Sequence, residues 1–185
     1  VSANLSLSDG GDRVLASLVE DGHDLDWKWP TVLPRPTLEG NRAIYHDVMP
    51  NTDLVVEANV TGFSHFLVVK EPPVGDLEIP VPMSLERARV EETPSGGVQI
   101  QALNGDVLAS ASEPLMWDSS SDVGGQPAVA SVDVSTGTSA SGAPVVTLSP
   151  DQSLLSDPDT VYPVVIDPSF TTVTSGGAWI QNPGY

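Results

Sequence analysis

The chain has 185 residues with 25 acidic against 7 basic side chains, a formal net charge of −18 that disfavours binding to nucleic acid and to anionic membranes. Cysteine is absent, which excludes disulfides, thiolate chemistry and cysteine-ligated zinc. The 16 glycines, 17 prolines and 5% aromatic residues favour many turns and short strands over long helices, and no apolar run is long enough for a membrane-spanning helix.

Apolar and polar residues alternate along most of the chain, a period that predicts strands. The segments "ANLSLSD" and "DRVLASLVE" flank a Gly-Gly turn at 10–11 and predict a hairpin. The next segment, "DGHDLDWKWP", places Leu25, Trp27 and Trp29 on one face of a third strand.

The middle of the chain contains the clearest strand pair, "DLVVEANV" (53–60) and "GFSHFLVVKE" (62–71), joined by a tight turn at Gly62. The segment "DLEIPVPMSL" then carries Pro80 and Pro82. Because proline donates no ladder hydrogen bond, this segment is predicted to be an edge strand or a covering loop. "RARVEE", "GVQIQAL" and "GDVLASAS" predict a three-strand meander, with a strong hairpin signal at Asn104–Gly105.

The last third begins with a predicted polar loop in "EPLMWDSSSDVGGQP" and continues with three strands, "AVASVDVST", "APVVTLS" and "TVYPVVIDPS". Between the last two, "SPDQSLLSDPDT" predicts a single helical turn, with Ser149 as its cap and Pro150 at its first position. The fold class predicted is all-β, an antiparallel β-sandwich of many short strands with at most one short helical turn. It spans residues 1–168, and residues 169–185 are predicted to be a linker or the truncated start of a following module.

Three tryptophans are candidates for ligand binding, because β-sandwich modules bind sugars on exposed aromatic rings. These are Trp27, Trp29 and Trp117. Large aromatic residues are more often part of a core, so an inward-facing strand would remove Trp27 and Trp29 from this role.

An acidic stretch, "DGHDLD", is the candidate metal site, with Asp21, Asp24 and Asp26 as ligands of a structural Ca²⁺. It matches no calcium-loop motif, so a solvated turn without any cofactor is the favoured interpretation. The three histidines lack zinc-ligand spacing.

No motif brings a nucleophile, an acid and a base together, and no serine occupies a G-x-S-x-G elbow. The chain is therefore predicted not to be an enzyme, with a glycan-active enzyme as the least favoured alternative. An isopeptide bond from Lys70 is a further alternative, although a surface lysine is the expected state.

Four phrases in order carry a resemblance to a known family: "GNRAIYHDVMPNTDLVV", "GFSHFLVVKE", "PLMWDSS" and "YPVVIDPSF". They resemble the β-rich region of actinobacterial secreted RHS-repeat and DNRLRE-domain-containing proteins, over about residues 40–170. The resemblance implies an extracellular or cell-surface location and a DNRLRE-type module after this region, and it implies no catalytic residues.

The expected function is a non-catalytic structural or interaction module of a large secreted or cell-surface protein. Its expected partners are neighbouring domains of the same polypeptide, with no nucleic acid and no membrane insertion. The alternative is a carbohydrate- or cell-wall-binding module, assisted by Ca²⁺, whose partner is polysaccharide.

Overall fold

The computed structural model describes residues 4–20, 22–59, 62–168 and 170–172, and these residues form an all-β fold. Every strand pair in the described residues is antiparallel. The strands of the first half are β1 (Asn4–Leu7), β2 (Val14–Glu20), β3 (His23–Lys28), β4 (Thr37–Glu39), β5 (Arg42–Met49), β6 (Thr52–Asn59), β7 (Gly62–Val69) and β8 (Ile79–Leu85). The strands of the second half are β9 (Ala88–Glu92), β10 (Val98–Ala102), β11 (Val107–Ala111), β12 (Leu115–Trp117), β13 (Val129–Thr138), β14 (Pro144–Pro150), β15 (Val164–Asp167) and β16 (Phe170–Thr172).

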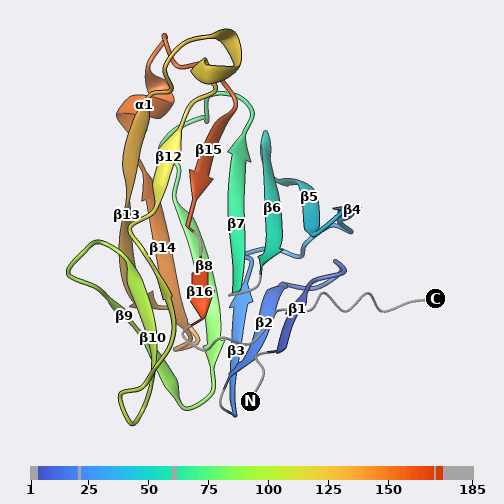
Figure 1. The fold of residues 1–185 in the computed structure, drawn as a ribbon, viewed down its shortest axis with the longest axis vertical. Helices are drawn as coiled ribbons and strands as arrows, with labels where there is room; N and C mark the ends of the chain where they lie inside the picture. Colours follow the sequence, from blue (N-terminus) through green and yellow to red (C-terminus); the bar gives the residue numbers. More distant parts are fainter. Residues whose placement is uncertain (1–3, 21, 60–61, 169, 173–185) are drawn as a thin grey trace.

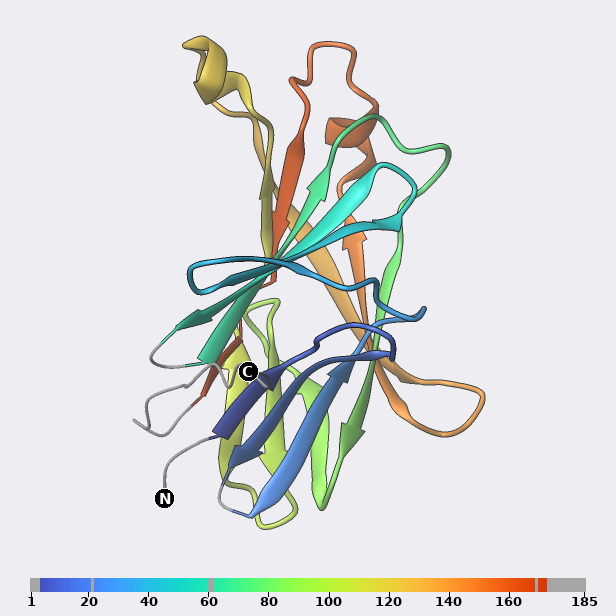
Figure 2. The same cartoon turned by 90° about the vertical axis from the view of Figure 1, so that its right-hand side faces the viewer.

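The strands form two layers, seen from the side in Figure 2. One layer has the order β1-β2-β3-β8-β14-β13, and the other begins with β4-β5-β6-β7. Beyond β7 the second layer divides, because β15 pairs with one end of β7 and β16 with the other. β15 leads through β12 to β13, and β16 leads through β11 and β10 to β9 (Figure 1).

Two side-chain contacts bring the layers together at their margins. The Thr136 backbone N–H donates to Glu92 Oε1 over 2.7 Å, which ties β9 to β13. On the opposite side, Tyr45 Oη donates to the Ser8 carbonyl over 2.6 Å, which ties β5 to the β1–β2 turn. The result is a sandwich whose sheets continue into one another through β12 and β13.

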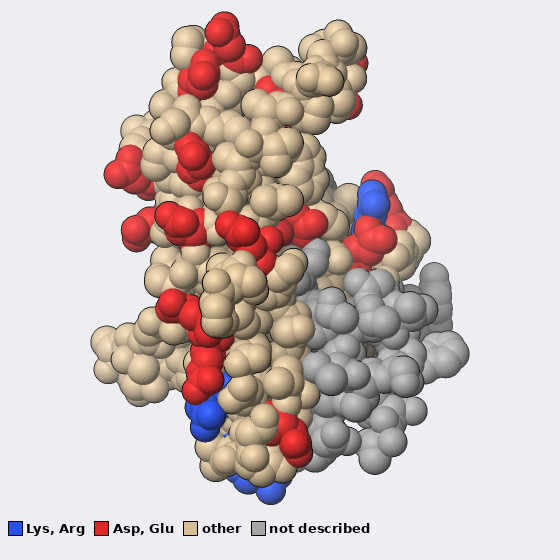
Figure 3. All heavy atoms as spheres, turned by 60° about the vertical axis from the view of Figure 1, so that its left-hand side comes forward, with Lys and Arg blue, Asp and Glu red and all other residues tan. Residues whose placement is uncertain are grey.

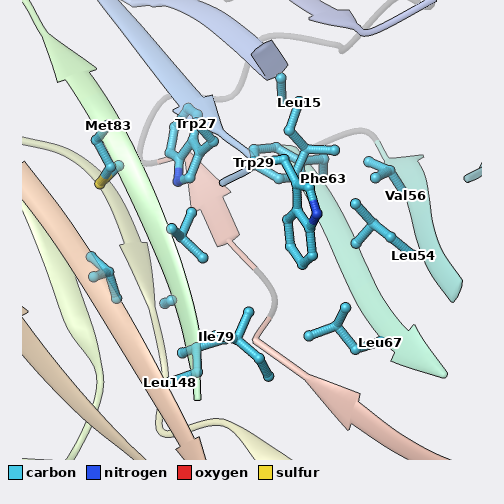
Figure 4. Close-up of a cluster of buried hydrophobic side chains, with 14 of the residues drawn as sticks. Leu15, Trp27, Trp29, Leu54, Val56, Phe63, Leu67, Ile79, Met83 and Leu148 are labelled. Carbon is cyan, nitrogen blue, oxygen red and sulfur yellow. The ribbon is translucent and has the colours of Figure 1, made fainter. Parts of the chain in front are cut away.

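The core lies between the layers and confirms the predicted inward faces (Figure 4). Trp27 from β3 meets Phe63 from β7 edge-to-face, with ring centroids 5.0 Å apart, an arrangement favoured by the ring quadrupoles. In the β6–β7 pair, Leu54, Val56 and Leu67 are buried as the alternation predicts.

Two local predictions need correction. Helix α1 (Gln152–Ser156) begins after Asp151, whose carboxylate accepts from the Leu154 N–H over 2.9 Å. Asp151 is therefore the N-cap instead of Ser149, and Pro150 ends β14. A second helical turn, the 3-10 helix η1 (Ser120–Val123), occupies the loop after β12.

Strand β8 lies inside its layer, whereas its prolines predicted an edge strand or loop. It pairs with β14 over residues 79–82 and with β3 over residues 83–85. The half of β8 that contains Pro80 and Pro82 therefore pairs with one strand only, β14. The N–H groups that the two prolines lack are thus not missed in hydrogen bonds to a second neighbouring strand.

Past residue 168, strand β16 pairs with both β7 and β11. The remainder of the predicted linker or truncated module, including Trp179, lies outside the described residues.

Candidate functional site

Trp27 and Trp29 belong to the core, with 0% and 1% of their surface exposed. The alternation that places them on one face of β3 and its extension turns that face inward, toward Phe63 and Leu15 (Figure 4). The ligand-binding prediction does not hold for these two residues, because their rings cannot stack on a sugar from inside the sandwich. Trp117 is different, since it lies partly exposed on β12.

The predicted calcium residues do not form a ligand set where they are described. Asp24 and Asp26 lie on the outer face of β3, and Asp26 accepts a 2.6 Å hydrogen bond from Ser17 Oγ. Asp21 lies outside the described residues. Within the described ranges, no three His, Asp or Glu side chains are grouped in a way that could hold a metal ion.

Asp118, which lies in the predicted polar loop "EPLMWDSSSDVGGQP", is buried and organises the loop after β12. Its carboxylate accepts from Ser120 Oγ over 2.6 Å and from the N–H groups of Ala128, Val161 and Ser120 over 2.9 to 3.2 Å. The Ser120 hydroxyl bond, with the backbone donors, outweighs burial and lowers the pKa of Asp118 to about 2. This carboxylate is occupied by protein donors and serves the fold.

An ionic cluster lies at the β5–β6 connection, within the first phrase of the family resemblance. Lys70 Nζ is 2.7 Å from Asp47 Oδ1 and 2.9 Å from Asp53 Oδ1, and His46 Nδ1 is 3.1 Å from Asp53 Oδ2. Asp47 has a φ of 52°, a left-handed conformation that non-glycine residues seldom adopt.

The protonation states in this cluster oppose an isopeptide bond. Hydrogen bonds to Asp47 and Asp53 raise the pKa of Lys70. Burial raises the pKa of Asp53, but hydrogen bonds from the Asp47 N–H, Lys70 and His46 outweigh it and lower the pKa. Amide formation needs a neutral amine and a protonated carboxyl, so this half-exposed lysine is held in the unreactive, charged form.

A continuous row of side chains crosses five strands, four of them on the outer face of the second layer and the fifth β13, where the two layers join. From β13 to β6 the directly opposed residues are Val129, Trp117, Val165, Val68 and Asp53. Val129 is 59% exposed and the next three are partly exposed. We call these first four residues the Trp117 stripe, and the strands that carry it lie side by side in Figure 1.

A second, parallel set of outward side chains extends this apolar face. Ile44, Val55 and Phe66 are directly opposed on β5, β6 and β7. On β12 and β15, Leu115 is opposed by Asp167. Leu115 is 46% exposed, and the other three apolar residues are partly exposed.

The flank of the molecule that lies on the left in Figure 1 comes forward in Figure 3, which shows many Asp and Glu side chains there beside few basic ones. An open groove of about 370 Å³ lies where residues 76–78, just before β8, meet β13, β14 and α1. Its lining includes Asp76, Glu78, Asp133 and Asp151. Because the groove is open, the carboxylates in its lining can remain hydrated. Its lining offers no apolar surface comparable to the Trp117 stripe.

Sequence reasoning identified Trp117 but missed the surface around it. The missed signal is the uninterrupted apolar runs "LVV" (54–56), "FLVV" (66–69) and "VVI" (164–166), which are typical of strands covered on both faces.

The chain was compared with family models, curated proteins and solved structures, and none of these matched. No helix among the described residues is long and apolar enough to cross a membrane.

Proposed function

We propose that this chain is a non-catalytic interaction module of a large secreted or cell-surface actinobacterial protein, and that it packs against neighbouring domains through the outer face of β5, β6, β7, β15 and β12. The resemblance described above supports the wider context. The observation that carries the proposal is the Trp117 stripe with its neighbouring outward residues Ile44, Val55 and Phe66.

This face favours an interface for an energetic reason. Soluble monomers keep large contiguous apolar patches to a minimum, and such patches commonly mark interaction sites. Completing the burial of a partly exposed valine or aromatic side chain contributes roughly 1 kcal/mol, so several in register can stabilise a domain contact. The ionic cluster at the β5–β6 connection then contributes to the polar rim that interfaces usually have.

Hydroxyl-radical footprinting of the isolated chain and of the longer polypeptide tests this proposal. Phe66 and Trp117 are expected to be oxidised several-fold more slowly in the longer polypeptide, because a neighbouring domain covers them. The exposed Leu103, which lies in the β10–β11 turn, is the control and should react equally in both. Equal oxidation of Phe66 and Trp117 in the two proteins would refute the proposal.

Trp117 favours one second candidate, binding of polysaccharide. A partly exposed indole on a flat strand face can stack on a sugar ring, and Val165 and Val129 extend the platform on either side. A titration with soluble cell-wall oligosaccharides, followed by the Trp117 indole resonance, tests it. An unchanged resonance would remove this candidate.

A further inference from the structure

We infer that Asn104 is a self-modification site, at which the backbone nitrogen of the next residue converts the side-chain amide into a carboxylate, with water as the co-reactant. The site lies in the β10–β11 turn, residues 103–106, which takes no part in the proposed function. The inference is therefore independent of that function.

The sequence distinguishes this asparagine from the others. Among the asparagines of the chain, only Asn104 is followed by glycine, as Gly105. In the reaction, the backbone nitrogen that follows an asparagine attacks the side-chain carbonyl carbon and closes a five-membered ring. Because glycine has no Cβ, its nitrogen is the least hindered in this attack. The Asn-Gly pair that favours a hairpin turn thus also favours this chemistry.

The turn is open to solvent. Asn104, Gly105 and Asp106 are exposed, and 68% of the surface of Leu103 is accessible. A Cβ placed on Gly105 would meet nothing within 4 Å, so the space beside this glycine is empty within the described residues. Water therefore reaches the reacting groups, and the turn can open locally without disturbing the core.

A backbone donor already contacts the group that is attacked. The Asp106 N–H donates to Asn104 Oδ1 over 3.1 Å. This hydrogen bond draws electron density from the side-chain carbonyl carbon and meets the oxygen on which negative charge develops during the attack. The turn thus stabilises the charge that forms when the ring closes.

The closed turn slows the reaction. The Gly105 N–H donates to the Ala102 carbonyl over 2.9 Å, and the Ala102 N–H donates to the Asp106 carbonyl over 2.8 Å. The Gly105 nitrogen must lose its proton and approach the side-chain carbon of Asn104, which requires the turn to open. We therefore expect the rate to follow the local opening of the turn.

The steps balance with water and hydroxide alone. The Gly105 nitrogen gives its proton to hydroxide and bonds to Asn104 Cγ, the bond from Cγ to Nδ2 breaks, and the amide nitrogen takes a proton from water and leaves as ammonia. Water then opens the cyclic imide at one of its two carbonyl carbons. One opening gives aspartate at position 104, and the other gives an isoaspartyl residue, in which the backbone continues through the side-chain carbon.

Both products alter the turn. The new carboxylate adds one negative charge to the −18 of the chain. It also replaces the amide that now donates to Asp106 Oδ2 over 2.7 Å with a group that repels that carboxylate. The isoaspartyl form further lengthens the backbone between β10 and β11 by one methylene group. The modified chain therefore carries a different turn at the end of this hairpin.

Mass spectrometry of the folded chain, kept at about pH 8 and 37 °C in water enriched in oxygen-18, tests the inference. Peptides that contain Asn104 are expected to gain about 3 Da, because a labelled hydroxyl replaces the amide group, and to separate into two products. Peptides that contain Asn41 or Asn51, neither of which precedes glycine, should stay unmodified. The chain unfolded in urea should convert at least threefold faster, because its turn is open.

Two variants test the ring-closing step. Asn104→Gln keeps a side-chain amide before Gly105, but its attack closes a six-membered ring, so conversion at this position should be at least tenfold slower. Ser95→Ala, in the exposed β9–β10 turn, is the matched control and should leave the conversion of Asn104 unchanged.

Four results would overturn the inference. The first is an Asn104 peptide that stays unmodified in the folded chain while the unfolded chain converts completely. The others are equal conversion at Asn41 or Asn51, conversion of Asn104→Gln at the parent rate, and equal rates in the folded and the unfolded chain, which would refute the dependence on turn opening.

Discussion

At the scale of single residues, Asp118 is the strongest polar anchor of the loop after β12. Asp118→Asn places an amide nitrogen against donors that now meet a carboxylate oxygen, and it is expected to lower the free energy of unfolding by roughly 2 kcal/mol. Urea denaturation measures the change. Asp122→Asn, on the exposed side of η1, should change it by less than about 0.5 kcal/mol. Equal effects of the two variants would contradict the role given to Asp118.

His65 is expected to make the free energy of unfolding depend on pH at values above those at which carboxylates titrate. Burial lowers its pKa to about 4 from an ordinary 6.5, and a cavity of about 10 Å³ beside the ring is lined mainly by apolar residues, including Trp27 and Leu148. The unfolded chain therefore binds a proton first, and stability is lost as the pH falls from 6.5 toward 4. Between pH 7.5 and pH 5 the free energy of unfolding is expected to decrease by about 2 kcal/mol.

The variant His65→Phe separates this effect from other titrations. Phenylalanine keeps a ring beside Phe63, whose centroid lies 5.9 Å from that of His65, and it cannot be protonated. Urea denaturation across pH 7.5 to 5 should then show little loss of stability. Asp118 contributes below this window, because its stabilisation is lost between about pH 4 and pH 2. A variant as acid-sensitive as the parent chain would show that other groups are responsible.

At the scale of elements, the β1–β2 turn combines two glycines with different constraints. Gly10 and Gly11 both have positive φ, but a Cβ at Gly10 would lie 2.5 Å from the Pro34 carbonyl oxygen, whereas at Gly11 it would meet nothing within 4 Å. Gly11→Ala is expected to cost about 1 kcal/mol for backbone strain alone. Gly10→Ala should cost at least about 2 kcal/mol more, because backbone must move. Similar thermal unfolding midpoints would refute the difference.

The elements also show what the sequence could predict and what it could not. Alternation identified the inward residues of β6 and β7, because one face of each strand must build the core. It could not place β15 and β16 beside β7, since that pairing joins segments far apart in the chain. Likewise, the Trp117 stripe depends on the register of five strands, and the Asp118 contacts depend on backbone groups from three segments.

At the scale of the whole molecule, the charge of −18 opposes compaction. Screening by NaCl between 20 and 300 mM should relieve about 1 kcal/mol of repulsion and raise the midpoint of thermal unfolding by roughly 2–4 °C. Differential scanning calorimetry measures this shift, and an unchanged or lower midpoint would contradict it.

Divalent cations extend the same experiment to the calcium prediction. At equal ionic strength, CaCl₂ and MgCl₂ are expected to raise the midpoint equally, because the described residues contain no grouped metal ligands. A larger rise in CaCl₂ alone would indicate a specific site, since a bound ligand stabilises the folded state by mass action.

The pairing of β7 with β15 and β16 has a consequence for the time course of synthesis. The β6–β7 hairpin leaves the ribosome well before β15 and β16, the strands that connect β7 to β12 and to β11. Contacts between distant segments form slowly, and a chain that waits for them exposes strand edges to other chains. The sandwich is therefore completed only after residues 164–172 have been synthesised. A nascent chain that ends before residue 164 still lacks the strands that join β7 to β12 and to β11.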